Sequence, residues 1–143
     1  MNIPFILEKA LSLYADKEAV VCGEARFTYR QFADRVYRLA NFFRTKGVGQ
    51  GDCVAILHQN SHEFLESYFA TAQVGAILNP LNFRLSPKEL AFIIRDSGAS
   101  LLIVSDRYAE GVEPLLEMGI NLNQVLWTGS MVATPATHPV NTN

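Results

Sequence analysis

The sequence predicts an α/β protein whose core is a mainly parallel sheet. Short apolar runs of strand length alternate with longer segments in which apolar residues recur at helical spacing. The runs at 53–57 and 101–104 are apolar throughout, as expected for parallel strands that helices cover on both faces. At 143 residues and 49% hydrophobic content, the chain can bury a real core and is too apolar to be disordered as a whole.

The N-terminal elements follow from local signals. Apolar residues at helical spacing predict a short amphipathic helix from Asn2 to Tyr14. Two β-prone runs around Gly23-Glu24 predict a hairpin. Thr28 and Gln31 have the form of a capping box, in which side chains satisfy the free N–H groups at a helix start. They predict a long helix over about 29–46.

The remaining elements alternate regularly. Ser86-Pro87-Lys88-Glu89 combines a cap, a proline at the first helical position and a closing glutamate, so it predicts a helix that ends near Gly98. The other predicted elements are a strand at 53–57, a helix from the Ser61 cap to Gln73, a strand at 76–79, a strand at 101–104, a helix from an Asp106 cap to Met118, and a strand at 124–127.

Two segments are expected along the chain. Residues 1–127 hold all the predicted elements and form one α/β segment. Residues 128–143 contain two prolines, five serines or threonines and no Lys, Arg, Asp or Glu, which is typical of a linker.

Composition excludes several classes of function. A net charge of -2 argues against nucleic acid as a partner. No apolar run approaches the roughly 20 residues of a transmembrane segment, and no secretory signal pattern opens the chain, so a cytoplasmic protein is expected. With only Cys22 and Cys53, a disulfide framework is not expected, and both are predicted to be buried free thiols.

The one glycine cluster does not fit a phosphate-binding loop. Such a loop follows a strand and opens a helix, whereas Gly47-Val48-Gly49-Gln50-Gly51 is predicted to follow a helix and precede a strand. It is interpreted as a structural turn.

Two side-chain clusters leave alternatives open. His58 and His62, with Glu63 and Glu66, combine residue types that bind zinc or iron, but Asn60-Ser61 should place the histidines on different elements. Ordinary surface and loop histidines are the favoured interpretation. The second cluster could form an anion-binding or partner-binding face, although a solvated helix surface is more common. It comprises Arg30, Arg35, Arg38, Arg44 and Lys46, against Asp34.

Polar residues follow three of the predicted strands. Ligands of open α/β sheets bind beyond the carboxyl ends of the strands, so these residues are candidates for a ligand-facing edge. The same residue types are common in turns and helix caps, which is the simpler interpretation. The segments are His58-Gln59-Asn60-Ser61, Asn79-Pro80-Leu81-Asn82 and Ser105-Asp106.

Several motifs occur in the order found in a known family. They are Phe27-Thr28-Tyr29-Arg30-Gln31-Phe32, Gly47-Val48-Gly49-Gln50-Gly51-Asp52-Cys53-Val54-Ala55-Ile56, Asn60-Ser61-His62-Glu63-Phe64, the run from Gly75 to Leu90, and Asp96-Ser97-Gly98-Ala99. Over about residues 5–127 the chain resembles the N-terminal part of AMP-forming acyl-CoA synthetases, members of the adenylate-forming superfamily. The run from Gly75 to Leu90 is more similar to the acyl-CoA synthetases than to the amino-acid-activating branch.

The resemblance implies an activity and its cofactors. Family members activate a carboxylic acid with ATP to an acyl-adenylate and then transfer the acyl group to coenzyme A, with magnesium. Their phosphate loop, ribose ligand, metal ligands and catalytic lysine lie downstream of the matched stretch. No catalytic, cofactor-binding or metal-binding residue is therefore assigned to this chain. Asn79, Asn82 and Arg84 are the residues that could face a ligand in a whole enzyme.

The leading hypothesis is an N-terminal scaffold segment of an acyl-CoA synthetase for a carboxylic acid, with a fatty acid expected. By itself the segment is expected to be inactive. The expected partners are the remainder of the enzyme, and a second copy through an exposed sheet edge. The alternative is a stand-alone α/β binding or assembly module.

Overall fold

The computed structural model describes residues 2–120, 122 and 124–129. The chain divides into two compact units. One comprises residues up to Cys53 together with Gln59–Leu78, and the other comprises Val54–His58 and the described residues from Asn79 onward. No helix in these described stretches is long and apolar enough to cross a membrane.

The first unit contains three helices and a hairpin. Helix α1 spans Ile3–Tyr14, and strands β1 (Glu18–Cys22) and β2 (Ala25–Thr28) pair antiparallel around the predicted turn. Helix α2 (Tyr29–Thr45) packs against α3 (His62–Val74), and Phe32 of α2 meets Phe69 of α3 edge-on with ring centroids 5.6 Å apart. The predicted hairpin and both long helices are confirmed.

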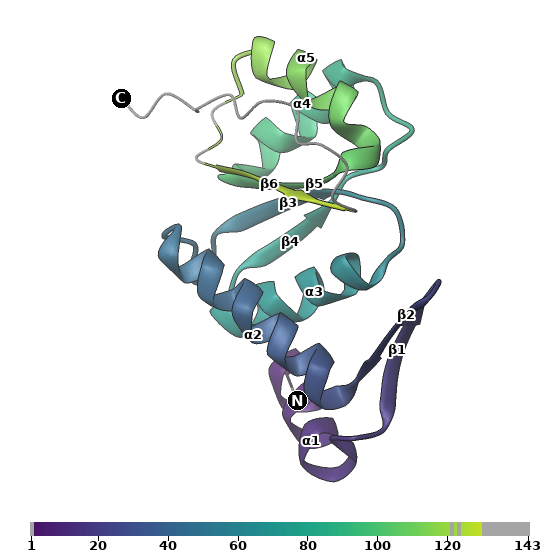
Figure 1. Ribbon diagram of the computed structural model, residues 1–143. Coiled ribbons are helices and arrows are strands. Elements are labelled where there is room, and N and C mark those ends of the chain that lie inside the picture. The colour runs from purple at the N-terminus through teal and green to yellow at the C-terminus, as the bar shows by residue number, and fades with distance from the viewer. Residues whose placement is uncertain (1, 121, 123, 130–143) are drawn as a thin grey trace. The chain divides into compact units, whose positions relative to one another are not determined.

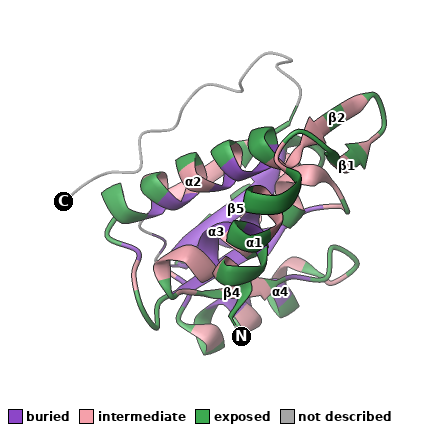
Figure 2. Cartoon of the chain, turned by 90° about the horizontal axis from the view of Figure 1, so that it is seen from below, coloured by how far each residue is buried: buried purple, intermediate pink, exposed green. Residues whose placement is uncertain are grey.

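Helix α1 buries less than its sequence pattern predicts. Leu7 is its only buried residue, and Figure 2 shows most of the helix in the colour of exposed residues. The apolar face expected for this helix is therefore largely open in the structure. Its exposed large apolar side chains are Ile3, Phe5, Ile6, Leu13 and Tyr14.

The glycine cluster is a structural turn between α2 and β3, as predicted. Gly47 and Gly51 have φ values of 76° and 84°, which favour glycine because other residues rarely adopt them. The Gly51 N–H donates to the carbonyl oxygen of Gly75 at 2.9 Å, and the Gly49 N–H donates to the Asp52 carboxylate at 2.7 Å. Two N–H groups of the loop are thus already hydrogen-bonded within the protein.

A four-stranded sheet has the order β4-β3-β5-β6. Its strands are β3 (Cys53–Leu57), β4 (Ile77–Pro80), β5 (Leu101–Ser105) and β6 (Gln124–Thr128). Strand β5 runs parallel to both β3 and β6, and every residue of β3 and β5 is buried. The predicted α/β class with a parallel sheet is confirmed.

Two helices of the second unit lie on one face of β5 and β6 (Figure 1). Helix α4 (Pro87–Ser97) begins at a complete capping box formed by Ser86 and Glu89 and ends at Gly98, as predicted. The backbone of Gly98 is left-handed. Helix α5 (Val112–Glu117) packs beside it.

The segment after β5 differs from the prediction of one helix capped by Asp106. Ser105 is the cap, and a 3-10 helix, η1 (Asp106–Gly111), precedes the short α5. The break has a local cause, because Gly111 weakens a helix interior and Pro114 has no N–H to donate to the preceding turn.

Cys53 is buried as predicted, but Cys22 is only half-buried; both are free thiols.

The predicted linker at 128–143 begins one residue too early, because Thr128 ends β6. Residues 130–143 lie outside the described part of the chain.

Candidate functional site

A buried histidine lies at the carboxyl ends of the parallel strands. His58 directly follows β3 and is 4% exposed, so the prediction of an ordinary surface or loop histidine is wrong about its burial. Its Nε2 lies 2.7 Å from Oγ1 of Thr128 in β6. The Thr128 hydroxyl also donates to the Val104 carbonyl at 3.4 Å. The contact between His58 and Thr128 joins the ends of β3 and β6 across β5.

Ser105 and Asp106 lie at the end of the next strand, β5. Ser105 is fully buried and pairs in register with Thr128. Its hydroxyl donates to the Asp106 carboxylate at 3.3 Å and accepts from the Arg107 N–H at 3.4 Å. The Ser105 hydroxyl therefore serves to cap η1.

Gly129 passes directly over the Asp106 carboxylate. A Cβ added at Gly129 would lie 2.3–2.4 Å from the three carboxyl atoms, and its φ of 141° already favours glycine. Gly129 and Thr128 fall in the stretch assigned to a linker, so sequence reasoning missed both.

The three residues predicted to face a ligand lie in β4 and the loop after it. Asn79 is half-buried in β4, whereas Asn82 and Arg84 are exposed. The Asn82 side chain accepts from the Arg84 N–H at 3.0 Å, which forms an Asx turn. Their role toward a ligand remains a prediction.

An aromatic pair links this loop to η1. Phe83 stacks on Tyr108 with ring centroids 5.4 Å apart and planes 19° from parallel, and the Arg84 guanidinium lies 5.7 Å from the Phe83 ring centroid. Neither aromatic residue was a predicted site residue, because the pairing joins positions separated by a helix and a strand.

The first unit holds a separate charged cluster around Glu66. The Glu66 carboxylate is nearly buried and binds Arg35 through Nε at 2.5 Å and Nη2 at 3.3 Å. His62 contacts Glu66 through Nδ1 at 3.0 Å and Glu63 through Nε2 at 3.2 Å. Phe27 packs against this cluster: its ring centroid lies 4.9 Å from that of His62 and 5.0 Å from the guanidinium carbon of Arg35.

This arrangement is a partly buried ion-pair cluster. The hydrogen bond to Glu66 raises the pKa of Arg35 above its ordinary value, opposed by burial and helped by the charges of Glu66, Glu63 and Asp34. Among the described residues no group of three or more His, Cys, Asp or Glu side chains could hold a metal ion. The side chains of this stretch do not fit a magnesium site, and no step of metal chemistry is assigned to them.

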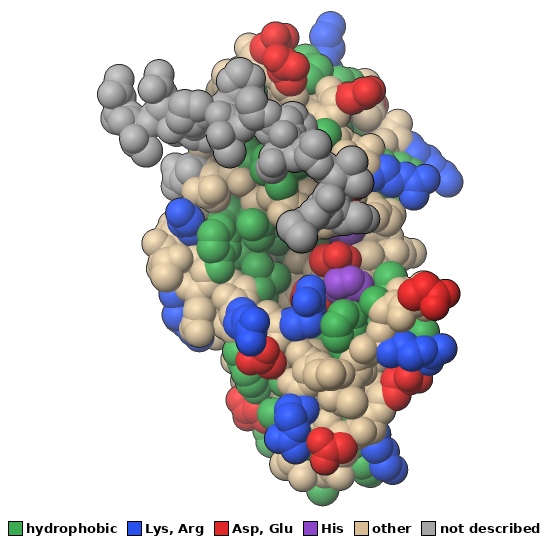
Figure 3. All heavy atoms as spheres, viewed as in Figure 1, with side chains coloured by type: hydrophobic (Ala, Val, Ile, Leu, Met, Phe, Trp, Pro, Cys, Tyr) green, Lys and Arg blue, Asp and Glu red, His purple; other side chains and the backbone are tan. Residues whose placement is uncertain are grey.

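The basic residues of α2 have partners within the protein. Arg30 pairs with Asp16 at 3.2 Å, Arg38 pairs with Asp34 at 2.8 Å, and Arg44 donates to Asn41 and to the Gln73 carbonyl. Figure 3 shows basic and acidic side chains interspersed on the visible face. The geometry favours the solvated helix surface over an anion-binding face.

The fold is that of an α/β protein with a parallel sheet, and comparison with known proteins identifies its family. Residues 7–136 match the family described as AMP-binding enzyme. The chain belongs to this family, and its motifs are those of the AMP-forming acyl-CoA synthetases.

Named relatives are CoA ligases. The chain is 40% identical over 102 residues to 4-hydroxybutyrate--CoA ligase 2 of Metallosphaera sedula, covering 71% of this chain and 19% of that protein. It is 47% identical over 97 residues to the feruloyl-CoA synthase of an Amycolatopsis species, covering 68% of this chain and 20% of that protein. The chain thus spans about a fifth of the length of these relatives.

A solved structure has the same fold. The fatty acyl CoA synthetase of Mycobacterium tuberculosis matches 89% of this chain and 26% of its own chain, with a TM-score of 0.84 and 27% identity.

Proposed function

We propose that this chain supplies the first part of the AMP-binding domain of an acyl-CoA ligase. The whole enzyme would activate a carboxylic acid with ATP and magnesium through an acyl-adenylate and transfer the acyl group to coenzyme A. The observation that carries the proposal is the identity of 40% and 47% to two CoA ligases over a stretch that is about a fifth of their length.

In this proposal the described residues act as scaffold. In the glycine loop after α2, the N–H groups of Gly49 and Gly51 are already hydrogen-bonded to Asp52 and to the Gly75 carbonyl. The hydroxyl of Ser105 caps η1. The sequence has no G-x-x-x-x-G-K-[ST] loop, and its last lysine is Lys88. The chain alone is therefore proposed to be inactive as a ligase, since no residue in it is suited to hold the ATP phosphates.

The acid is proposed to be a fatty acid, and the location of the protein is proposed to be the cytoplasm. The fatty acyl CoA synthetase fold match supports a fatty acid. The names of the two relatives, a 4-hydroxybutyrate ligase and a feruloyl-CoA synthase, argue that the acid is set outside this stretch.

The partner is proposed to be the remainder of the ligase, bound at the sheet edges. Strands β4 and β6 are the edges of the sheet in the described residues, and each carries a large exposed apolar residue, Ile77 at 58% and Trp127 at 46%. Such edges pair readily with another strand. In the isolated chain, the same edges would favour association with a second copy.

Isothermal titration and an exchange assay test the proposal together. The purified chain is titrated with ATP and magnesium, and separately with coenzyme A, and is then assayed for acid-dependent exchange of labelled pyrophosphate into ATP. No saturable heat and no exchange above a blank are expected. Saturable binding would place a nucleotide or thiol site in this chain, and exchange would overturn the scaffold proposal.

A further inference from the structure

Helix α4 carries an apolar stripe on its exposed side, centred on Phe92. Phe92 is 67% exposed, the highest value among the large apolar residues that the structure describes. A shallow groove of about 390 Å³ runs beside it, lined by Leu85, Lys88, Glu89, Phe92 and Ile93. Most of the surface of Phe92 lies outside the core of its own chain and is available to another surface.

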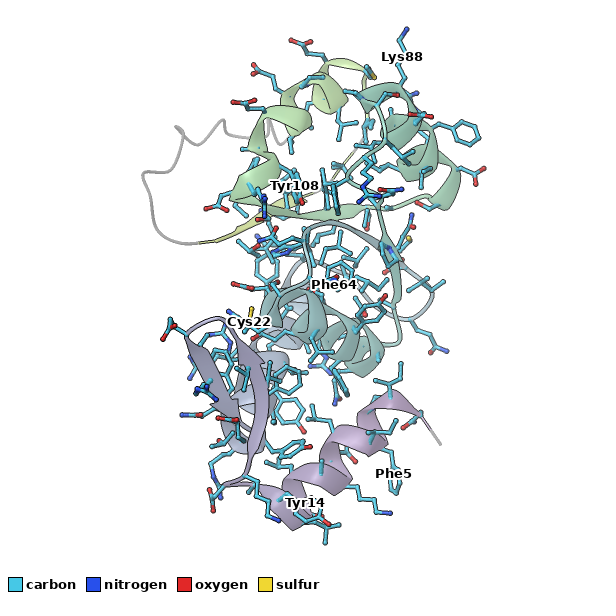
Figure 4. All side chains as sticks on the ribbon, turned by 90° about the vertical axis from the view of Figure 1, so that its right-hand side faces the viewer. Phe5, Tyr14, Cys22, Phe64, Lys88 and Tyr108 are labelled. Atoms are coloured by element: carbon cyan, nitrogen blue, oxygen red, sulfur yellow. The ribbon has the colours of Figure 1, made fainter. Side chains whose placement is uncertain are left out.

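Two charges flank Phe92 and have no partner within the described part of the chain. Lys88 lies in the first turn of α4 and Asp96 in its last turn, and both are exposed. Figure 4 shows Lys88 extending away from the helix into solvent. Both charges oppose the helix dipole, which favours anions at the N-terminus and cations at the C-terminus. Their placement therefore costs the isolated helix stability.

The spacing of these residues is self-complementary. Lys88 lies four residues before Phe92 and Asp96 lies four residues after it. If two copies of α4 align antiparallel about a two-fold axis at Phe92, each Lys88 faces the Asp96 of the other copy, and the two Phe92 rings meet. The same alignment places Glu89 opposite Arg95, although each of these already has a partner in its own chain.

We propose that α4 is a homodimer contact in which two copies of this chain pair antiparallel through Phe92, Lys88 and Asp96. The second copy is the occupant because the exposed stripe carries opposite charges at equal distances from its apolar centre, which an isologous contact requires. An aromatic pair and two exposed ion pairs form a weak contact, so dimerisation at high micromolar concentration is expected. This inference does not depend on the proposed ligase function.

Charge exchange tests the contact. Lys88→Asp places two aspartates opposite each other in both halves of the dimer, and Asp96→Lys does the same with lysines. Each single variant should weaken self-association by about tenfold in sedimentation equilibrium. The double variant should regain wild-type association. An equimolar mixture of the two single variants should form heterodimers, because every facing pair is then opposite in charge.

Folding does not confound the test. Asp at position 88 and Lys at position 96 both suit the helix dipole, so thermal unfolding should show each variant to be at least as stable as the wild type. Association that is the same in the wild type, both single variants and the double variant would overturn the proposal and assign self-association to another surface, such as the edge of β6. A monomeric wild type at high micromolar concentration would also overturn it.

Discussion

Arg35 of α2 binds Glu66 of α3 through two nitrogen-oxygen contacts, 2.5 Å from Nε and 3.3 Å from Nη2. The two partners are not equally exposed, because the side chain of Glu66 is 7% exposed and that of Arg35 is 40% exposed. Losing Arg35 leaves a buried carboxylate, whereas losing the charge of Glu66 leaves a cation that water can reach. The pair therefore predicts unequal costs for its two single substitutions.

We expect Arg35→Met to lower the free energy of unfolding by about 3 kcal/mol, because Glu66 then loses both guanidinium contacts in a nearly dry site. Glu66→Gln should cost about 1 kcal/mol. Urea denaturation measures both. Arg38→Met is the matched control, since the Arg38–Asp34 pair is exposed on both sides and should contribute less than about 0.5 kcal/mol. Equal losses for Arg35→Met and Arg38→Met would contradict this account.

The contact between His58 and Thr128 predicts a loss that depends on the hydroxyl. Thr128→Val keeps the shape but removes the hydrogen-bond partner of the buried His58 Nε2, so the free energy of unfolding should fall by about 1–2 kcal/mol. Thr128→Ser retains the hydroxyl and should lose less. A valine variant as stable as the serine variant would show that the hydrogen bond contributes nothing.

Alanine substitutions at Gly129 and Gly111 should have opposite effects on stability. Gly129→Ala forces a Cβ against the Asp106 carboxylate at an unfavourable φ and should cost about 2 kcal/mol or more. Gly111 has ordinary helical angles and nothing within 4 Å of an added Cβ, so Gly111→Ala should stabilise by about 0.5–1 kcal/mol. Thermal unfolding compares the two, and a Gly129→Ala protein that is no less stable than the wild type would contradict the observed packing.

The capping box of α4 predicts a pH dependence. The Ser86 hydroxyl and backbone N–H donate to Glu89 at 2.7 and 2.8 Å and hold the pKa of Glu89 below its ordinary 4.5. Because the folded pKa is lowered, the contribution of ionised Glu89 to stability is complete above 4.5 and is lost as the pH falls through the lower folded value.

Ser86→Ala should move the pKa of Glu89 back toward its ordinary value, which a carboxyl-carbon NMR titration measures. It should also reduce the stability that the protein loses between a pH well above 4.5 and one well below it. Ser86→Thr keeps the hydroxyl and should retain the low pKa. An unchanged titration of Glu89 in the alanine variant would rule out the Ser86 hydroxyl as the main cause.

Local chemistry was enough to predict most element boundaries. Helix α4 is the clearest case, because its cap, proline, capping glutamate and terminal glycine all act within the helix ends. The start of η1 was missed because Ser105 and Asp106 are adjacent capping residues. The choice between them depends on how far β5 extends along its neighbour, where Ser105 pairs with Thr128.

The candidate site was only partly predictable for the same reason. The strand-end rule named His58 and Ser105 as candidates, and their role toward a ligand stays a prediction. The burial of His58 depends on Thr128, 70 residues away in a stretch that was predicted to be a linker. In the sequence, Glu66 lies near His62 in a cluster of residue types that bind metal ions. Its actual partner, Arg35, is 31 residues distant, and no local pattern connects the two.

This stretch is proposed to be scaffold, with the acid chosen elsewhere in the enzyme. The most direct measurement exchanges the matching stretch of two relatives, the 4-hydroxybutyrate ligase of Metallosphaera sedula and the Amycolatopsis feruloyl-CoA synthase, for that of this chain. CoA ligation is then assayed with both acids in each folded chimera. Each chimera is expected to remain active and to keep the acid preference of its host. Folded chimeras that share a new preference, or that bind ATP but ligate neither acid, would contradict it.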